Sequence, residues 1–371
     1  MDSTSRNEIL VYVGTYTQPE AHVLGKGQGI YLYRMDPASG VLTFDSMMTG
    51  PVNPSFLAID PRRRFLYAVS EAMTLDGQPG GAVYAYAIHP KTRRLAYINR
   101  QPSHGAATCY LSVEPTGRWV LAANYAGGTV AVFPIEEDGR LGLATSVVQH
   151  TGSSVNPERQ QAPHPHSIVP DPAGRFVFAA DLGLDKIMIY RLDETRGTLT
   201  PNEPPWVAVQ AGAGPRHFVF HPQGRYAYLL NELDATLTAF AYHAARGALT
   251  PVQTVDTLAD TGHGLCADVH VAPSGRFIYT SHRGHDSLTI FAIDPESGRL
   301  TYLGHESTQG KTPRNFAIDP TGGFLLVANQ DTDTLVTFRI DGPTGALVPT
   351  GHVTDVPTPV CIKMVRYLPS Q

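Results

Sequence analysis

Residues 214–240 read Gly-Pro-Arg-His-Phe-Val-Phe-His-Pro-Gln-Gly-Arg-Tyr-Ala-Tyr-Leu-Leu-Asn-Glu-Leu-Asp-Ala-Thr-Leu-Thr-Ala-Phe, and the pattern of this stretch decides the fold. Its aromatic and apolar runs predict three short β-strands, which begin at Phe218, Tyr226 and Thr236. Between the first two strands, His221-Pro222-Gln223-Gly224 predicts a tight turn, because Pro presets φ and Gly tolerates a positive φ. The stretch is therefore expected to form a hairpin followed by a third strand.

Two oppositely charged residues flank this hairpin. Arg216 lies six positions before Pro222, and Glu232 lies ten positions after it. In an antiparallel hairpin centred near Gly224, both positions return to the same end. We therefore expect an arginine and a glutamate together at one mouth of the unit.

The same turn recurs along the chain at intervals of about 50 residues. A period of this length that contains several short strands is typical of a β-propeller, in which each repeat forms one blade. The prolines that mark the six copies are Pro61, Pro115, Pro172, Pro222, Pro273 and Pro320.

A second marker counts seven blades. A turn that ends in Leu precedes a predicted outer strand at Leu42, Leu95, Leu141, Leu199, Leu249, Leu300 and Leu347. Seven outer strands against six hairpins leave one inner strand unaccounted for. The sequence of residues 358–364 resembles that of residues 312–318, which predicts this inner strand at the C-terminus. Residues 9–16, near the N-terminus, have the pattern of a second strand. The pattern predicts an all-β, seven-bladed propeller in which the C-terminal strand completes the first blade, as a single domain over residues 1–371.

Composition narrows the possible partners. The net charge of −5 argues against nucleic-acid binding, which requires a basic face. The first ten residues lack the apolar core of a signal peptide, and no apolar run approaches membrane-spanning length. Cys109, Cys266 and Cys361 form no disulfide or metal pattern and are expected to be buried thiols. We expect a cytoplasmic monomer or homodimer that does not bind a membrane.

Alignment of the repeats on their prolines identifies a candidate site. The sixth position before and the tenth position after each proline map to one face of the ring, opposite the turns. Both converge on the central channel, which is the large concavity that such a ring offers. The charged residues and histidines that meet there are His166, Arg216, Arg283, Arg314, Glu71 and Glu232. The excess of Arg and His over Glu favours a small anionic ligand.

A structural role is the alternative for these residues. An Arg–Glu pair beside a channel is often a satisfied ion pair and nothing more. Several cations on different blades that point the same way are harder to explain by packing, so we interpret Arg216 and Glu232 as functional. For Arg314 and Glu71 both interpretations stay open.

Two histidines, His164 and His166, end a long connection over residues 151–163. Histidine is the side chain that acts as an acid or a base near neutral pH, although a histidine can also simply cap a strand. A metal at this pair would need a third ligand, which is not evident. A second set of residues lies nine positions after each proline and forms a ring of Ser70, Asn124, Asp181, Asn231, His282 and Asn329. The oxygens of this ring could bind a hard cation, but Asn and Asp also commonly end strands. We expect no metal and no cofactor.

The chain resembles the seven-bladed propeller lactonases, a family that includes the bacterial propeller-type 6-phosphogluconolactonase and the fungal carboxymuconate lactonising enzyme. The matching motifs follow one another along most of the chain: Gly14-Thr15-Tyr16-Thr17, Asn124-Tyr125-Ala126-Gly127-Gly128, His164-Pro165-His166-Ser167, Gly214-Pro215-Arg216-His217, Asn231-Glu232-Leu233 and Arg283-Gly284-His285-Asp286-Ser287. The resemblance implies a metal-independent lactone hydrolase, and 6-phosphogluconolactone is the expected substrate.

By these motifs the family's proposed catalytic group falls on His164 or His166, Arg216, Glu232 and Arg283. Ester hydrolysis needs an activated water, for which Glu232, His164 and His166 are the candidate bases, and donors that hold an oxyanion, for which the arginines are suited. We expect Arg314, Glu71, His217 and Tyr125 to contact the substrate. The alternatives are a carboxymuconate-type cycloisomerase, a hydrolase of another sugar lactone, and a non-enzymatic propeller that binds a partner on one face.

Overall fold

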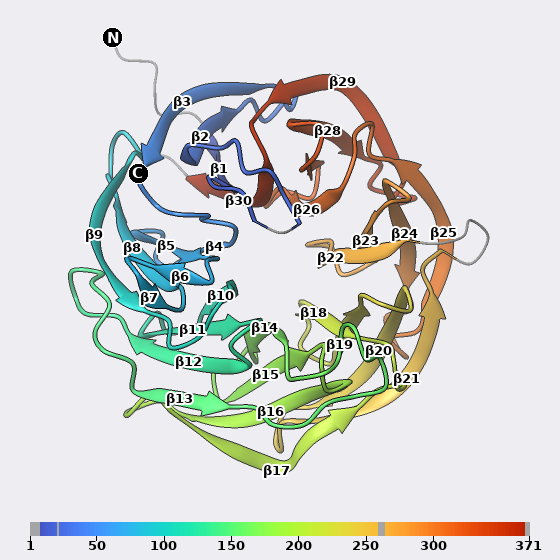
Figure 1. Cartoon of the computed structure of the whole chain (residues 1–371). Coiled ribbons are helices and arrows are strands. Elements are labelled where there is room, and N and C mark those ends of the chain that lie inside the picture. The colour runs from blue at the N-terminus through green and yellow to red at the C-terminus, as the bar shows by residue number, and fades with distance from the viewer. Residues whose placement is uncertain (1–7, 21, 259–263, 368–371) are drawn as a thin grey trace.

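Seven four-stranded antiparallel sheets form a ring around a central channel in the computed structural model, which describes residues 8–20, 22–258 and 264–367 (Figure 1). This arrangement confirms the all-β, seven-bladed prediction. Blade 1 contains β1, and the other blades are numbered in chain order. None of the described residues forms a helix that is long and apolar enough to cross a membrane.

Each blade contributes one strand to each of four concentric positions (Figure 1). The innermost strands, next to the channel, are β4 (Leu57–Ile59), β10 (Thr108–Val113), β14 (Pro165–Pro170), β18 (Pro215–Phe220), β22 (Leu265–Val271), β26 (Pro313–Ile318) and β30 (Pro359–Tyr367). The second strands are β1 (Glu8–Thr15), β5 (Phe65–Ser70), β11 (Trp119–Asn124), β15 (Phe176–Asp181), β19 (Tyr226–Asn231), β23 (Phe277–Arg283) and β27 (Phe324–Asn329).

The third strands are β2 (Gly29–Met35), β8 (Ala82–Ile88), β12 (Thr129–Pro134), β16 (Lys186–Asp193), β20 (Thr236–His243), β24 (Ser287–Ile293) and β28 (Thr334–Ile340). The outer strands are β3 (Leu42–Thr49), β9 (Leu95–Pro102), β13 (Ser146–Gln149), β17 (Thr198–Ala208), β21 (Ala248–Asp256), β25 (Leu300–Ser307) and β29 (Leu347–Asp355). A small hairpin of β6 (Thr74–Leu75) and β7 (Gln78–Pro79) is inserted between β5 and β8.

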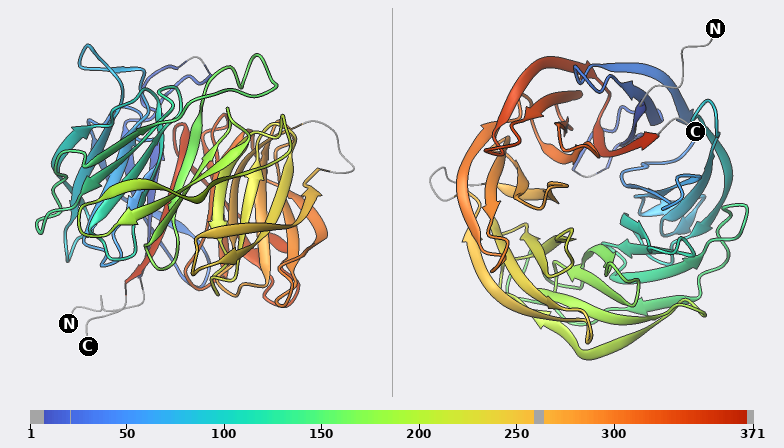
Figure 2. Two further views of the ribbon diagram at one scale, coloured as in Figure 1. Left: turned by 90° about the horizontal axis from the view of Figure 1, so that it is seen from below. Right: turned by 180° about the vertical axis from the view of Figure 1, so that it is seen from behind.

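The ring closes through blade 1. Its strand order is β3-β2-β1-β30, so the last strand of the chain is the innermost strand of the first blade. β30 pairs antiparallel with β1, and Met364 lies opposite Val11. The view from behind in Figure 2 shows the red β30 beside the dark blue strands of blade 1. This pairing joins the two ends of the chain in one sheet and leaves no open edge between the first and last blades.

The repeated turns have a common geometry. The carboxylate of Asp171 accepts hydrogen bonds from the backbone N–H groups of Arg175 and Phe176, at 2.7 and 2.9 Å. Gly224 has a φ of +67°, the left-handed conformation that glycine adopts without strain. The first copy has Arg63 at the equivalent position, with a φ of +59°, so the geometry persists where the glycine is missing.

One predicted outer strand begins later than expected. In blade 3 the strand starts at Ser146 rather than at Leu141. Leu141 is fully buried, forms an isolated bridge with Ile135, and exchanges hydrogen bonds with Asn99 of the neighbouring blade. Packing between blades therefore takes this residue out of the strand.

The apolar core lies between adjacent blades. Phe178 of blade 4 stacks on Phe218 of blade 5 at a ring-centroid distance of 5.4 Å, within a cluster built from both blades. Tyrosines on second strands add hydrogen bonds from one blade to the next, as Tyr228 donates to Gly298 O at 3.2 Å and Tyr279 donates to Gly345 O at 2.9 Å. These contacts make the ring a rigid support for the side chains that face the channel.

Candidate active site

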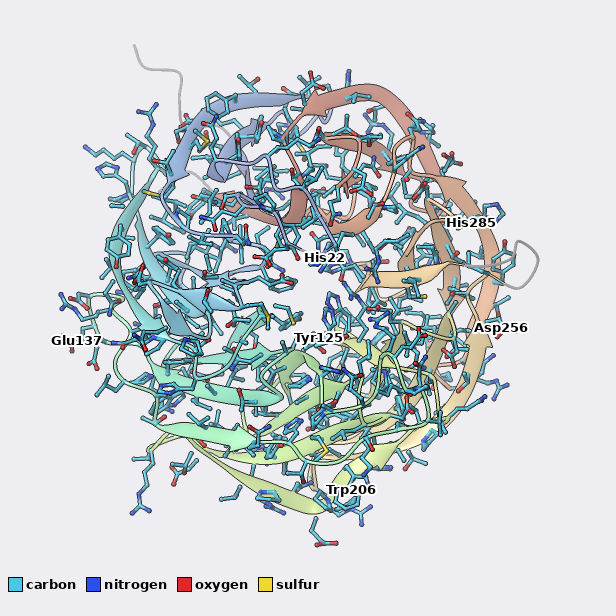
Figure 3. The ribbon with its side chains drawn as sticks, viewed as in Figure 1. His22, Tyr125, Glu137, Trp206, Asp256 and His285 are labelled. Atoms are coloured by element: carbon cyan, nitrogen blue, oxygen red, sulfur yellow. The ribbon has the colours of Figure 1, made fainter. Side chains whose placement is uncertain are left out.

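The channel opens on one face into a pocket of about 470 Å³. All seven blades or their connections contribute to it, and Figure 3 shows the labelled His22 and Tyr125 on opposite sides of the central opening. The pocket lies on the face opposite the Pro-Gly turns. The lining confirms the predicted convergence, because it includes His166, Arg216, Arg283, Arg314, Glu71 and Glu232.

Glu232 is the centre of a buried charge cluster. Its side chain is 2% exposed, and Arg216 Nη1 lies 2.5 Å from Oε2. Arg283 Nη2 lies 3.2 Å from the same oxygen, and Arg159 Nη2 lies 2.7 Å from Oε1. Burial alone would raise the pKa of Glu232, but Arg283, Arg216 and Arg159 hold this pKa well below its usual value. Glu232 is therefore a stable anion that orients three guanidinium groups, and it is a weak base.

Arg216 is fixed by its contacts on three sides. Besides Glu232, its Nη1 lies 2.6 Å from Nε2 of His166, and its Nε donates to Ala267 O at 2.6 Å. Since a guanidinium can only donate, Nε2 of His166 is assigned as the acceptor and the imidazole as neutral. Burial, together with the charge of Arg216, holds the pKa of His166 well below its usual value. The lone pair of His166 is thus already occupied by an arginine.

Two further arginines line the pocket and have guanidinium donors without a partner among the described residues. Arg283 donates from Nη2 to Cys266 O at 3.0 Å, while its buried Nε has no hydrogen-bond partner among the described residues. Burial lowers the pKa of Arg283 to about 10, so it stays cationic at neutral pH. Arg314 is 11% exposed, and its Nη2 lies 3.8 Å from Oε1 of Glu71, too far for a hydrogen bond. Within the described ranges its guanidinium makes no hydrogen bond to the protein.

The structure separates the two predicted histidines. His166 lines the pocket, whereas His164 does not. His164 stacks on the ring of Tyr125 at a centroid distance of 4.5 Å, and its Nδ1 lies 2.9 Å from Tyr125 O. Tyr125 does line the pocket, as predicted. The structure thus places His164 outside the pocket lining, in contact with Tyr125, and its catalytic role stays a prediction.

His217 occupies a different place from the one predicted. It does not line the main pocket but a small adjoining chamber of about 10 Å³. The register of β18 shifts between Pro215 and His217, and such a bulge re-aims side chains. The consecutive Arg216 and His217 are consequently both directed toward the channel, where Arg216 lines the pocket and the chamber and His217 lines the chamber alone.

Sequence reasoning missed Arg159 and His22. Arg159 comes from the connection over residues 151–163, in which the sequence analysis indicated no site residue. Its backbone N–H donates to Asn156 Oδ1, and the next residue, Gln160, is buried and donates to Leu182 O. The connection is thereby anchored beside the pocket. Burial lowers the pKa of His22 to about 4, so His22 is neutral at physiological pH.

The ring of Asn and Asp residues braces the blades. Asn124 donates to Thr129 Oγ1 at 2.9 Å, and Asn231 donates to Thr236 Oγ1 at 2.8 Å. Asp181 accepts from the backbone N–H of His164 at 2.7 Å. These bonds favour the strand-ending interpretation of the ring. Among the described residues, no group of three or more His, Cys, Asp or Glu side chains is arranged to hold a metal ion.

The chain is a seven-bladed propeller whose channel pocket is lined by four arginines, an arrangement suited to an anionic ligand. The chain belongs to the family described as lactonase, 7-bladed beta-propeller, which it matches over residues 10–364. It is 38% identical to a 6-phosphogluconolactonase of Bacillus subtilis over 95% of this chain and 97% of the relative. It is 33% identical to a 6-phosphogluconolactonase of Formosa agariphila, covering 83% of this chain and 86% of that one.

A solved structure shows the same architecture. The periplasmic gluconolactonase of Pseudomonas aeruginosa superimposes with a TM-score of 0.90 at 35% sequence identity. The match covers 98% of this chain and 100% of that protein. The family and the fold are thus established together.

Proposed function

We propose that this protein hydrolyses 6-phosphogluconolactone to 6-phosphogluconate. The observation that carries the proposal is the convergence of Arg159, Arg216, Arg283 and Arg314 on one pocket in the channel. Hydrolysis of a lactone develops negative charge on the carbonyl oxygen, and the product is a carboxylate. Both are anions that guanidinium groups stabilise through charge-assisted hydrogen bonds. The curated relatives that are named 6-phosphogluconolactonase support the substrate.

The guanidinium groups of Arg283 and Arg216, which both line the pocket, are proposed to stabilise the oxyanion. A single such donor is typically worth about 3 kcal/mol of transition-state stabilisation. Glu232 contributes by holding these cations together, since three neighbouring guanidiniums would otherwise repel one another. In this account Glu232 is an orienting anion, which replaces its earlier assignment as a candidate base.

Arg314 is proposed to bind the phosphate. It faces the pocket with hydrogen-bond donors that no described residue uses, and a planar guanidinium can present two parallel donors to phosphate oxygens. Glu71 stays nearby as a partial counter-charge, with its Oε2 held by Ser55 at 2.5 Å. The phosphate would therefore replace a weak ion pair with charge-assisted hydrogen bonds.

A second candidate substrate is gluconolactone without the phosphate. The Pseudomonas aeruginosa relative is described as a gluconolactonase, which favours this alternative. That relative is also described as periplasmic, a location that differs from the cytoplasmic one expected for this chain. The compartment, and the choice between monomer and homodimer, stay predictions.

The test is hydrolysis of freshly generated lactones by the purified protein. We expect kcat/KM for 6-phosphogluconolactone to exceed that for gluconolactone by at least about tenfold, the value of one charge-assisted hydrogen bond. Equal or higher kcat/KM for gluconolactone would contradict the phosphate assignment. No rate above the spontaneous background on any lactone would favour the partner-binding alternative.

A further inference from the structure

A second buried polar cluster, centred on Asp268, lies next to the arginine pocket, and its residues have no role in the reaction proposed above. The carboxylate of Asp268 on β22 contacts two histidines, with Oδ1 2.7 Å from Nδ1 of His217 and Oδ2 2.9 Å from Nε2 of His270. Asn315 donates to Oδ2 as well, at 2.5 Å. The side chain of Asp268 is 4% exposed. Burial alone would raise its pKa, but His270 and His217 lower it, so Asp268 is an anion.

This arrangement fixes the orientation of the His217 ring. An ionised carboxylate only accepts hydrogen bonds, so Nδ1 of His217 carries the proton that Asp268 accepts. Nε2 is then the nitrogen with the lone pair. Among the described residues Nε2 has no hydrogen-bond partner, although the ring is almost entirely buried. Asp268 thus holds His217 as a neutral imidazole with an unused acceptor.

The imidazole with this unused acceptor lines a chamber that is the size of about one water molecule. The chamber has a volume of about 10 Å³, which is near the minimum that holds a water. It adjoins the pocket, because the two cavities share the lining residues Glu71, Cys109, His166, Arg216 and Arg314. A water in this chamber would therefore lie next to a lactone in the pocket.

We propose that His217, held by Asp268, is the general base that activates the attacking water from this chamber. The inference rests on the proposed lactone hydrolysis and names a base for it. The other candidates are less suited, since Glu232 is neutralised by three arginines and Nε2 of His166 accepts from Arg216. Cys109 is also unsuited, because burial raises the pKa of its thiol and keeps it protonated.

The step conserves atoms and charge. The water oxygen forms a bond to the lactone carbonyl carbon, and its proton passes to Nε2 of His217. The carbonyl electron pair becomes the oxyanion, which the arginines stabilise. When the carbonyl re-forms, the ring C–O bond breaks, and the departing alkoxide oxygen takes the proton back from His217. Asp268 stays ionised throughout and stabilises the transient imidazolium.

The surroundings of His217 determine the pH at which it can act. Burial lowers its pKa to about 4, Asp268 opposes this shift, and the charges of Arg216 and His270 add to it. The neutral aromatic rings of Phe56 and Tyr110 and the imidazole of His166 also pack against it. Arg314 and Glu71 also line the chamber. His217 is therefore an unprotonated acceptor at every pH above about 4.

The experiment compares His217→Asn with His270→Asn. The amide of Asn at position 217 can still donate to Asp268, but it offers nothing in place of Nε2. His270 is the matched control, because it contacts the same carboxylate through the other oxygen, is 31% exposed and lines neither cavity. We expect His217→Asn to lower kcat for 6-phosphogluconolactone at least about a hundredfold with KM within about threefold. His270→Asn should keep kcat within about threefold of the wild-type value.

The pH profile separates a base from a structural histidine. In the wild-type protein kcat/KM should fall as pH drops through about 4, because His217 becomes protonated. His22 has a similar pKa, so the assignment depends on the loss of this fall in His217→Asn. Wild-type kcat in His217→Asn, or an equal loss in His270→Asn, would overturn the proposal. If His217→Asn does not fold, His217→Gln is tested instead. A wild-type kcat/KM that does not change as pH drops through about 4 would by itself contradict the proposal. An inactive wild-type protein would instead reject the proposed function.

Discussion

Replacement of Glu232 by glutamine tests the arginine cluster directly. The variant keeps the size of the side chain and part of its hydrogen bonding, but it removes the negative charge that lies within 3.2 Å of three guanidinium groups. The carboxylate is almost fully buried, so little water can replace it on the side of Arg216. We therefore expect both the rate and the stability to fall.

The magnitudes follow from this burial. Removal of one partner from a buried charge pair costs about 3–5 kcal/mol, and the lower end applies here because Arg159 is 36% exposed and the pocket admits water. A loss of about 3 kcal/mol corresponds to a fall in Tm of about 3–6 °C for a chain of this size. Disordered oxyanion donors should lower kcat/KM at least about a hundredfold, or about 2.7 kcal/mol.

The assay combines steady-state kinetics with thermal melts in rising concentrations of inorganic phosphate. Three guanidiniums without their carboxylate should bind phosphate more tightly, so phosphate should raise the Tm of Glu232→Gln more than that of the wild-type protein. Arg34→Gln, which removes one guanidinium from Asp45 on the outer part of blade 1, serves as a control for general effects of charge loss. Wild-type kcat/KM together with a lowered Tm would refute the reasoning and leave the cluster as a structural ion-pair network.

Three other outcomes are expected. Arg314→Lys keeps the charge but loses the planar pair of donors. It should therefore raise KM for 6-phosphogluconolactone about tenfold and leave KM for gluconolactone nearly unchanged. An equal rise of KM for both substrates would place the phosphate elsewhere. Glu232 and Asp268 both have folded pKa values below their unfolded values, so the stability they contribute is present above the unfolded pKa of about 4 and is lost as pH falls below it. Thermal melts from pH 7 down to about pH 3 should therefore show a steeper fall for the wild-type protein than for Glu232→Gln, and parallel curves would contradict this linkage. Activity should survive EDTA, whereas loss restored by calcium would support a metal at the Asn and Asp ring after all.

The sequence predicted the blades well because each blade is a local object. The Pro-Gly turn sets the register of its own hairpin, so the proximity of Arg216 and Glu232 follows from counting residues to the turn. The ring closure was predictable for the same reason, since residues 359–364 repeat an inner-strand pattern that lacks a partner in its own repeat. Leu141 deviates where a neighbouring blade, rather than its own hairpin, determines its conformation.

The features of the site that the sequence did not place occur where the periodicity ends. Arg159 and His22 come from connections, whose paths depend on contacts such as Gln160 with Leu182 rather than on a repeat. His164 precedes the first residue of β14, so its position relative to His166 could not be taken from strand alternation. A register shift near the start of β18 moved His217 from the predicted pocket to the chamber next to it.

The central claim is that the lactone binds and reacts in the arginine pocket of the channel. The most direct measurement is a crystal structure of the protein with 6-phosphogluconate, the product of the proposed reaction. The account predicts a ligand in the pocket, with its carboxylate within hydrogen-bond distance of Arg216 or Arg283 and its phosphate on Arg314. A ligand bound at saturating concentration elsewhere on the ring, with none in the channel pocket, would contradict it.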